Sequence, residues 1–505
     1  MAPLRRRFYN RILIILSSLA VCHGDMPRTH GQEQARCFVK RDGTAFYLNG
    51  CPYRLTGTNQ YYQMIHRRGG DRPRVNEVLD EMAARGMTVL RTWAFQDDAG
   101  RSDCLQCAPA RQLAPHERPA NFMNETTFRG LDELLVQASS RGIRVILTLV
   151  NNWDDFAGMR RYSLWRFGPQ GVNHDAFYND PVIRAWFKEY ISLLVNRVNY
   201  VNGRRYRDDP TILAWELANE ARCLDALDSP CRTGAWIDSW ILEMSCYIKS
   251  IDPNHLVTTG SEGFYGPNRA DGNTDSWMTN EGTDFVDNHS GPCIDFATIH
   301  VWPRNWGWDP LAQTDAALAR VQEYTLRRLA DGLNILGKPV VIEEFGLPRD
   351  DSSRCPDSGA LGPTSIRDRF YRLFYSLCEG AASPDGSCAG ALNWMVYDAV
   401  SCAYDDENGV FFPDDSSTDD VMTEHAHRFG TCSGTPGSSE STCPGDMDFE
   451  CDVDLADFPL FPGCLSGPDL DADMPECIGV DIVRDGRVDL KDIAQFQIRF
   501  SGGCP

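Results

Sequence analysis

The segment Ile212-Leu-Ala-Trp-Glu-Leu-Ala-Asn-Glu220 is a mostly apolar run that ends in an amide and a carboxylate. A run of this kind is typical of a strand that is buried on both faces of a parallel sheet. Seven other runs of similar character recur along the chain, and segments of helical length separate them. The predicted strands are Arg54–Thr58, Val89–Trp93, Val145–Val150, Ile212–Leu217, Leu256–Gly260, Phe296–Val301, Val340–Phe345 and Ala389–Trp394.

The segments between these strands carry apolar residues spaced by three and four, which predicts helices, for example over Arg74–Arg85, Thr127–Arg141 and Val182–Asn199. Eight buried strands that alternate with helices predict an α/β fold, a (β/α)8 TIM barrel. In such a barrel the loops that follow the strands form one shared concave face, where active sites lie. The residues that end each predicted strand are therefore candidates for a functional site.

Polar, ionisable and aromatic residues recur at these strand ends. Aromatic rings stack against sugar rings, and amides and carboxylates form hydrogen bonds with hydroxyl groups. The composition of this end of the barrel therefore predicts a site for a polyhydroxylated ring. The strand ends read Arg91-Thr-Trp93, Asn151-Asn-Trp153, Asn219-Glu220, His300-Val-Trp302, Glu343-Glu-Phe-Gly346 and Asn393-Trp394.

Two carboxylates, Glu220 and Glu344, follow strands that lie far apart in the sequence. Glycoside hydrolysis uses such a pair: one carboxyl group protonates the departing oxygen, and the other attacks the anomeric carbon or activates water. We assign Glu220 as the acid/base and expect Arg91 to keep Glu344, the nucleophile, ionised. A lone glutamate at a strand end is more often structural, and alternation along the strands favours structural roles for Glu216 and Glu343.

At these residues the chain resembles glycoside hydrolase family 5, and in particular its plant and fungal endo-β-1,4-mannanases. The segments Trp215-Glu-Leu-Ala-Asn-Glu220 and Val341-Ile-Glu-Glu-Phe-Gly346 are similar to the two catalytic signatures of that family, and the similarity extends from about Phe38 to Tyr397. The resemblance implies retaining double displacement on internal β-1,4-mannosidic bonds of mannan, glucomannan or galactomannan, without a cofactor. It also implies that Arg91 is the family's strand-two arginine.

Further residues are expected to support the site. We predict Trp93 and Trp394 as sugar platforms, Asn152 and Asn219 as contacts to hydroxyl groups, and His300 as part of the catalytic cluster. The family usually has His-x-Tyr after strand six, whereas this chain has His300-Val-Trp302. An indole N–H donates one hydrogen bond and accepts none, so Trp302 is expected to hold a carboxylate without reproducing every role of a phenol.

Composition and the amino-terminal residues bear on location and partners. The 505-residue chain has a net charge of −22, which disfavours binding to nucleic acid or to anionic lipid. Residues 1–24 have a basic start and a short apolar run, which predicts a signal peptide, a secreted protein and no membrane span. A lipid-anchored form is the alternative, since Leu19-Ala-Val-Cys22 loosely resembles a lipoprotein cleavage site.

After the predicted catalytic domain, residues 36–430, a small polar linker covers residues 431–443. Residues 444–505 contain two acidic repeats at an offset of 35 residues, counted from Asp446 to Asp481. Their spacing approximates calcium loops and resembles dockerin modules, which implies a cohesin-like protein partner. A solvated acidic tail is the alternative reading. The predicted Ca²⁺ ligands are Asp446, Asp448, Glu450, Asp454, Asp457, Asp481, Asp485, Asp489 and Asp492.

The cysteines indicate an oxidising compartment, because Cys104 with Cys107 and Cys223 with Cys231 are close enough in sequence for local disulfides. A zinc site at Cys104-x-x-Cys107 is the weaker interpretation, since no second ligand pair follows. Two alternative functions remain open at this point. One is a β-1,4-glucanase of the same family, and the other is a carbohydrate-binding pseudoenzyme anchored through its tail.

Overall fold

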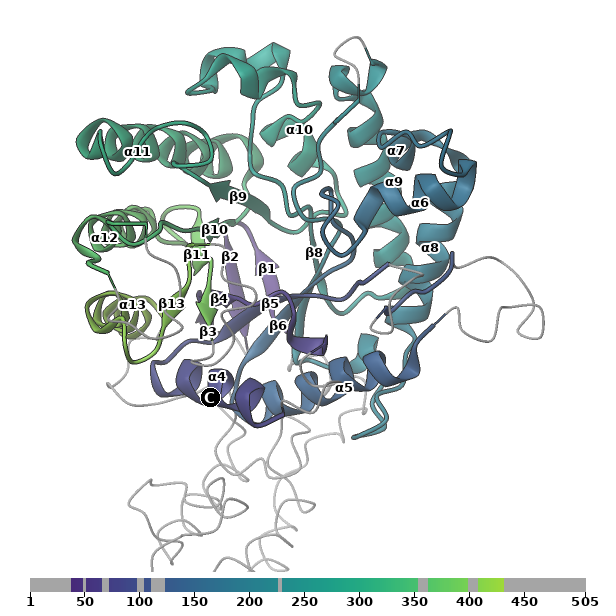
Figure 1. Ribbon diagram of the computed structural model, residues 1–505, viewed down its shortest axis with the longest axis horizontal. Helices are drawn as coiled ribbons and strands as arrows, with labels where there is room; N and C mark the ends of the chain where they lie inside the picture. Colours follow the sequence, from purple (N-terminus) through teal and green to yellow (C-terminus); the bar gives the residue numbers. More distant parts are fainter. Residues whose placement is uncertain are drawn as a thin grey trace, which may run out of the picture.

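The computed structural model describes residues 38–48, 51–65, 72–97, 104–109, 123–225, 229–352, 362–397 and 407–430. Their centre is an eight-stranded parallel sheet rolled into a barrel (Figure 1). Each predicted strand is present, with ends displaced by at most two residues, so the predicted (β/α)8 barrel is confirmed. The strands are β4 (Leu55–Asn59), β5 (Val89–Trp93), β6 (Arg144–Thr148), β7 (Ile212–Glu216), β8 (Leu256–Thr258), β9 (Ala297–Val301), β10 (Val340–Phe345) and β11 (Cys388–Asn393).

The strand order is β8-β7-β6-β5-β4-β11-β10-β9, so β8 and β9 stand at the two ends of the ladder. Hydrogen bonds join β8 to the residues just before β9. The Asp295 amide donates to the Val257 carbonyl at 2.8 Å, and the Thr258 hydroxyl donates to the Phe296 carbonyl at 2.9 Å. These bonds hold β8 beside the start of β9, where the ladder does not pair the two strands, and nearly close the barrel.

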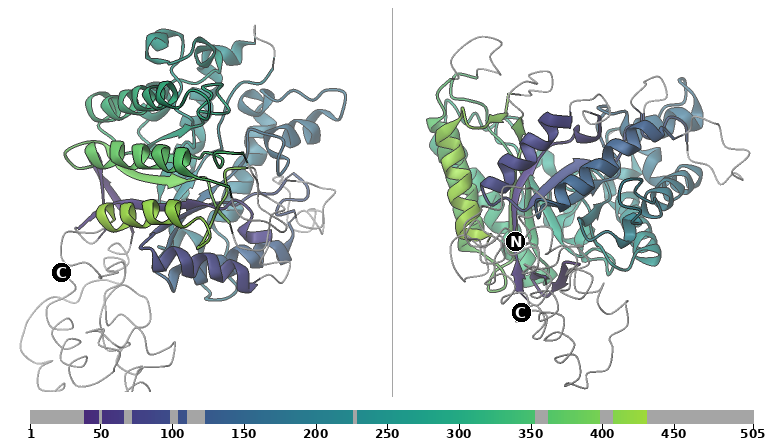
Figure 2. Two further views of the ribbon diagram at one scale, coloured as in Figure 1. Left: turned by 60° about the vertical axis from the view of Figure 1, so that its left-hand side comes forward. Right: turned by 90° about the horizontal axis from the view of Figure 1, so that it is seen from below.

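The helices form an outer layer around the strands, as two further views show (Figure 2). The long helices turn an apolar face inward, and local signals fix their starts. Asp180 caps α8 by accepting hydrogen bonds from two main-chain amides, and Pro181 occupies the first turn. The α-helices are α4 (Arg72–Ala84), α5 (Glu125–Ser139), α6 (Gly158–Phe167), α7 (Ala176–Asn179), α8 (Pro181–Val195), α9 (Ala235–Ile251), α10 (Phe285–Ser290), α11 (Thr314–Asp331), α12 (Ser365–Gly380) and α13 (Ser416–Phe429).

A small antiparallel sheet of β1 (Lys40–Asp42), β2 (Ala45–Leu48) and β3 (Cys51–Tyr53) covers the amino-terminal end of the barrel. Phe46 packs edge-on against Phe296, with ring centroids 5.3 Å apart, within a cluster that includes apolar residues of most barrel strands. This end is therefore filled by apolar side chains. The opposite end, where the strands terminate, remains free for chemistry. A short pair, β12 (Val396–Tyr397) and β13 (Val410–Phe411), lies beyond β11.

Disulfides join segments around the barrel. The two local pairs suggested by the sequence, Cys104–Cys107 and Cys223–Cys231, are both present. Two more, Cys246–Cys293 and Cys378–Cys388, tie α9 to the segment before β9 and α12 to β11. Because Cys104 and Cys107 are bonded to each other, the zinc interpretation of that pair is wrong.

The predicted signal peptide (residues 1–24), linker (431–443) and calcium-loop module (444–505) lie outside the described residues. The same is true of every predicted Ca²⁺ ligand from Asp446 to Asp492. Within the described residues, no helix has the length and apolar character that crossing a membrane requires.

Candidate active site

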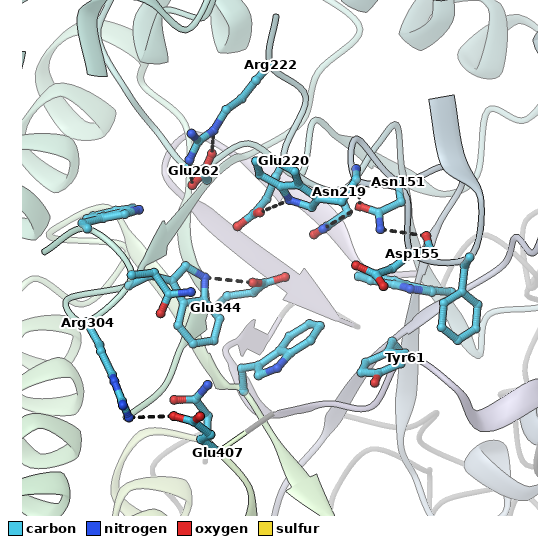
Figure 3. A pocket seen from close by; sticks show the side chains of 18 of the residues that line it. Tyr61, Asn151, Asp155, Asn219, Glu220, Arg222, Glu262, Arg304, Glu344 and Glu407 are labelled. Atoms are coloured by element: carbon cyan, nitrogen blue, oxygen red, sulfur yellow. Dashed lines mark hydrogen bonds and ion pairs between the residues drawn. The ribbon is translucent and has the colours of Figure 1, made fainter. Parts of the chain in front are cut away.

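A cavity of about 1080 Å³ opens where the barrel strands end (Figure 3). The cavity wall includes six of the residues that the sequence singled out: Trp93, Asn219, Glu220, Trp302, Glu344 and Trp394. Figure 3 shows Glu220 and Glu344 converging on the same space from different strands. The convergence of these two carboxylates, far apart in the sequence, is therefore confirmed.

Glu220 lies in the loop that follows β7 and has a left-handed backbone conformation, with φ of +55°. Its amide donates to the Gly260 carbonyl at 2.8 Å, which fixes this unusual turn. The Nε1–H of Trp153 donates to Oε2 at 2.7 Å, and Nδ1 of His300 lies 2.8 Å from Oε1. Both carboxylate oxygens are therefore held in place by ring nitrogens.

Glu344 lies near the end of β10 and is held by three nitrogen groups. Arg91 donates from Nη1 to Oε1, and Trp302 donates from Nε1 to Oε2 at 3.2 Å. The Nδ1 atom of His300 lies 3.4 Å from the same Oε2. Trp302 therefore acts as the sequence predicted, as a donor to a carboxylate.

One oxygen of Glu220, one oxygen of Glu344 and a ring nitrogen of His300 all lie within 4.8 Å of one another. Three buried ligand atoms at this spacing could accept a cation, but the Arg91 guanidinium, bonded to Glu344, would repel it.

A second group of potential metal ligands, Asp175 with Cys223 and Cys231, is excluded as a metal site because the two thiols form a disulfide.

Arg91, on β5, is completely buried and organises the floor of the site. It donates to both oxygens of Glu216, at 2.8 and 2.7 Å, and to the side-chain oxygens of Asn59 and Asn219, at 2.9 and 2.8 Å. Glu216 is thus a structural partner of Arg91, as predicted. Asn219 orients its amide by donating to Asn151 at 3.0 Å.

Glu343 departs from the simple alternation that the sequence suggested. The register between β9 and β10 shifts at this residue, so that Ile342 pairs with Ile299 and Glu344 pairs with His300. Such a bulge redirects a side chain. The Glu343 carboxylate is consequently buried inside the barrel, 3.4 Å from Nε2 of His300. The expectation that the side chains of Glu343 and Glu344 point to opposite sides of the strand is therefore wrong.

The buried charges determine where the protons lie. Burial disfavours the charged His300 ring, but the carboxylates of Glu344, Glu220 and Glu343 together raise the pKa of His300 to about 10. Burial also opposes ionisation of Glu220, yet His300, Arg222 and Trp153 lower its pKa to about 2. These shifts favour an ionised Glu220 with the nearest proton on His300, whereas the sequence suggested a neutral Glu220.

The pKa of Glu344 is raised, mainly by burial and partly by the charge of Glu220, while His300 and Arg91 oppose this rise. Arg91 therefore favours the anion, as expected, but its effect does not exceed that of burial.

Aromatic rings line the cavity beside the carboxylates. Trp394 stacks on Tyr61, with centroids 5.4 Å apart and an interplanar angle of 16°. Its ring also lies 6.0 Å from Trp93 and 6.1 Å from Trp302, the latter edge-on. The two residues predicted as platforms, Trp394 and Trp93, thus belong to one aromatic wall.

Asn152 is not placed as the sequence suggested. Its side chain is buried, and Oδ1 accepts hydrogen bonds from the Arg222 amide at 2.9 Å and from the Tyr178 hydroxyl at 3.2 Å. The neighbouring Asn151 lines the cavity instead. Of the two asparagines, Asn151 therefore faces the cavity and Asn152 faces the protein interior.

The sequence reasoning missed an ion pair above Glu220. Arg222 donates to both oxygens of Glu262, and its guanidinium lies 4.7 Å from the Phe264 ring and 5.4 Å from the Trp277 ring. Burial raises the pKa of Glu262 to about 7, and Arg222 opposes this rise. The only indication of this ion pair in the sequence was that Arg222 lies two residues after Glu220.

A second missed pair, Arg304 with Glu407 at 2.7 Å, lies at another edge of the cavity (Figure 3).

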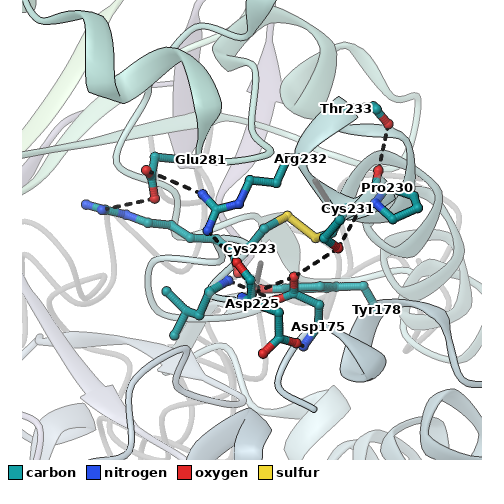
Figure 4. Close-up of a disulfide and its surroundings, with 12 residues drawn as sticks. Asp175, Tyr178, Cys223, Asp225, Pro230, Cys231, Arg232, Thr233 and Glu281 are labelled. Atoms are coloured by element: carbon teal, nitrogen blue, oxygen red, sulfur yellow. Dashed lines mark hydrogen bonds and ion pairs between the residues drawn. A yellow bond between two sulfur atoms is a disulfide. The ribbon is translucent and has the colours of Figure 1, made fainter. Parts of the chain in front are cut away.

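The loop that carries Arg222 is fixed just beyond the site. Figure 4 shows the Cys223–Cys231 disulfide with Asp225, Arg232 and Glu281 around it. The Cys223 amide donates to the Glu281 carbonyl at 2.9 Å, and Arg232 donates to the Asp225 carbonyl at 2.8 Å. These bonds hold the segment after Glu220 against the barrel.

The comparisons with known proteins point to one family. A family model described as GH family 5 beta-mannosidase-like matches residues 36–419. The chain is 36% identical over 446 residues to Mannan endo-1,4-beta-mannosidase 5 of Arabidopsis thaliana, covering 86% of this chain and 96% of that protein. It is 38% identical over 400 residues to Mannan endo-1,4-beta-mannosidase 1 of Oryza sativa subsp. japonica, covering 77% and 85%.

Solved structures give the same result. The endo-1,4-beta-mannanase from Rhizomucor miehei superposes with a TM-score of 0.62 at 32% identity, covering 78% of this chain and 99% of that one. The endo-beta-1,4-mannanase from Thermotoga petrophila gives a TM-score of 0.61 at 32% identity, covering 76% and 78%.

Proposed function

Because the chain belongs to glycoside hydrolase family 5, in its beta-mannosidase-like group, and is a glycoside hydrolase, we propose that it is an endo-β-1,4-mannanase. Its substrates are then internal β-1,4-mannosidic bonds of mannan, glucomannan or galactomannan. The relatives named as mannan endo-1,4-β-mannosidases support this choice over a β-1,4-glucanase. The open cavity with an aromatic wall is compatible with a polysaccharide chain.

The observation that carries the mechanism is the close approach of the Glu220 and Glu344 carboxylates, whose nearest oxygens lie within 4.8 Å. Retaining glycosidases have carboxyl groups about 5–5.5 Å apart, whereas inverting enzymes need about 6.5–9.5 Å to admit a water molecule. The spacing therefore supports double displacement with Glu344 as nucleophile and Glu220 as acid/base.

In the first step, an oxygen of Glu344 bonds to the anomeric carbon while the glycosidic C–O bond breaks, and the departing oxygen takes a proton from Glu220. In the second step, Glu220 accepts a proton from water as the water oxygen displaces Glu344. Trp302 and Arg91 hold the attacking carboxylate, because each donates a hydrogen bond to it. No cofactor is required by either step.

The remaining residues are assigned by their positions. Trp394 and Trp93, in the aromatic wall, form platforms for sugar rings, and Asn219 and Asn151 offer amide groups to ring hydroxyls. Asn152 keeps only a structural role in this assignment.

An activity panel tests the proposed function. We expect the purified protein to release reducing ends from mannan and glucomannan and to release few from carboxymethylcellulose. Proton NMR during hydrolysis of a mannan oligosaccharide should show the β-anomer first, as retention requires. Preferential cleavage of carboxymethylcellulose would establish the glucanase alternative, and binding without turnover would establish the pseudoenzyme alternative.

We expect Trp302→Phe to raise the pH below which activity is lost. A hydrogen bond to a carboxylate stabilises its ionised form and lowers its pKa, so removing the Nε1 donor raises the pKa of Glu344. Because catalysis needs the Glu344 carboxylate, activity falls at a higher pH in the variant than in the wild type when the solution is acidified. The acidic limb of kcat/KM should move up by roughly one pH unit, given about 1.4 kcal/mol per unit.

Trp302→Tyr serves as the control, because a phenol can donate a hydrogen bond. It should bring the acidic limb back toward that of the wild type. An unchanged limb in Trp302→Phe would show that the 3.2 Å contact does not influence Glu344.

We also propose that the protein is secreted and that its carboxy-terminal residues bind Ca²⁺ and a cohesin-like protein. The disulfides support an oxidising compartment, and the sequences of residues 1–24 and 444–505 are the basis for the rest. Calorimetric titration of the full chain with Ca²⁺ tests the metal proposal, which fails if no binding is detected.

A further inference from the structure

Glu343 is a buried ionisable group that has no role in the mechanism of double displacement. Glu343 is completely buried beside the catalytic pair, and its Oε1 atom has no hydrogen-bond partner in the described part of the chain. A buried carboxylate with an unsatisfied oxygen is costly, so its position calls for an explanation. The bulge between β9 and β10 brings this side chain into the barrel beside His300.

The groups around Glu343 come from several strands. On β9, Nε2 of His300 lies 3.4 Å from Oε2, and on β5, Nε of Arg91 lies 3.8 Å from the same oxygen. On β7, the Glu216 carboxylate repels the Glu343 charge. On β4, the Asn59 amide donates to the main-chain oxygen of Glu343 at 2.9 Å. The adjacent Glu344 contacts the other ring nitrogen of His300.

His300 thus lies between carboxylates on both sides. Nδ1 faces Glu220 at 2.8 Å and Glu344 at 3.4 Å, while Nε2 faces Glu343 at 3.4 Å. A neutral imidazole has one N–H, so one nitrogen would direct its lone pair at a carboxylate oxygen. The ring and its neighbours avoid this repulsion only when they share an additional proton.

We propose that Glu343 is a positioning residue that acts through His300 to keep a proton beside Glu220, and that it thereby sets the alkaline limit of activity. The proposal rests on the proposed function of Glu220. The proton moves by breaking the Nδ1–H bond of the imidazolium and forming an O–H bond on Glu220. The ring remains neutral with its Nε2–H directed at Glu343, and the total charge of the cluster is unchanged.

In the resting cluster the shared proton lies on His300, because carboxylates face both of its ring nitrogens. Coupled groups lose protons as a unit, and a nearby anion makes that loss harder. Burial and the charge of Glu216 raise the pKa of Glu343 to about 7, so the carboxyl group becomes an anion as the pH rises through neutrality. Its negative charge therefore appears in the range where the catalytic proton would otherwise be lost.

The variant Glu343→Gln tests this inference, since glutamine has the same shape but no charge. On mannotetraose, whose leaving group needs a proton, we expect the alkaline limb of kcat/KM to move down by about one pH unit, a roughly tenfold loss near pH 8. On 2,4-dinitrophenyl β-mannobioside, whose leaving group departs without protonation, the loss at the same pH should be less than about twofold. Equal losses on both substrates, or an unmoved limb, would overturn the proposal.

Glu216→Gln is the matched control. Glu216 is equally buried and also bonded to Arg91, and none of its contacts in the described residues is with His300. This variant should reduce activity through Arg91 while moving the alkaline limb by less than half as much as Glu343→Gln. If the alkaline limb moved as far in Glu216→Gln as in Glu343→Gln, the effect would come from any buried charge, and this result would contradict a specific role for Glu343.

A measurement on the wild-type protein keeps the inference testable if the variant does not fold. In ¹⁵N-histidine-labelled protein, both ring nitrogens of His300 should be protonated at pH 8, and a neutral ring would overturn the proposal. This readout needs no substrate. Failure of the proposed function would instead appear as a wild-type protein that does not cleave mannotetraose.

Discussion

Glu344→Gln is expected to lose at least about four orders of magnitude in kcat/KM on mannan, while its affinity for mannan oligosaccharides changes little. Glutamine keeps the shape of the side chain, and its one oxygen can still accept the hydrogen bond of either Arg91 or Trp302, which donate to different oxygens of Glu344. It cannot form the ester bond to the anomeric carbon that double displacement requires. Initial rates on mannan and calorimetric binding of mannotetraose measure the two effects separately.

Glu407→Gln provides a comparison for this variant. Glu407 also lines the cavity, but it pairs with Arg304 at 2.7 Å and is not among the groups that meet at His300. We expect its activity to fall by less than about tenfold, because a partly exposed ion pair contributes about 1 kcal/mol or less. Near wild-type turnover in Glu344→Gln would rule out Glu344 as the nucleophile.

A trapping experiment locates the nucleophile directly. A 2-deoxy-2-fluoro mannosyl fluoride slows the second displacement more than the first, so the ester accumulates and the labelled peptide can be identified by mass spectrometry. The label should be on Glu344. A label on Glu343 would reverse the roles of these two adjacent residues, which the bulge in β10 brings to the same side of the barrel.

Those features of the structure that depend on hydrophobic periodicity and on strand order could be predicted from the sequence. The apolar runs marked all of the barrel strands, and the rule that active sites lie at the ends of barrel strands was enough to bring Glu220 and Glu344 together. The contact between Arg91 and Glu344 was expected on the same basis, and the structure places it between β5 and β10.

Features that depend on local backbone geometry were not predictable. The alternation rule placed Glu343 outside the site, because a bulge is invisible in a sequence that alternates normally. The choice between Asn151 and Asn152 failed for a similar reason, since a strand end does not reveal which of two identical residues faces the cavity.

The protonation pattern of the site was not predictable from the sequence either. The sequence predicted a neutral Glu220 and an ionised Glu344. The pKa of each carboxyl group depends on its distance from His300, whose Nδ1 atom lies 2.8 Å from Glu220 and 3.4 Å from Glu344. The difference matters for catalysis, because a Glu220 whose neighbours favour its anion must gain a proton before it can act as an acid.

Glu220→Ala should reduce kcat/KM on mannan by about three to four orders of magnitude, because the departing sugar oxygen then leaves without a proton. With 2,4-dinitrophenyl β-mannobioside the first displacement should remain fast, since dinitrophenolate needs no acid. The second displacement should be slow, because Glu220 no longer activates water. The expected result is a burst of dinitrophenol followed by a slow steady state.

Added azide should accelerate that steady state, because azide attacks the glycosyl-enzyme without a general base and the missing side chain leaves room for it. The product should be β-mannosyl azide, which reports both the position of the lost carboxylate and the retention of configuration.

Glu262→Gln is the control that makes the test specific. Glu262 lines the same cavity and is paired with Arg222, and its pKa of about 7 would suit an acid in its own right. If Glu262 were the acid, azide would rescue a variant at position 262 and not Glu220→Ala. We expect the opposite, because Glu220 is within 4.8 Å of Glu344 and next to the proton on His300. Glu262 is held by the bidentate contact with Arg222, which leaves it poorly placed to approach a departing oxygen.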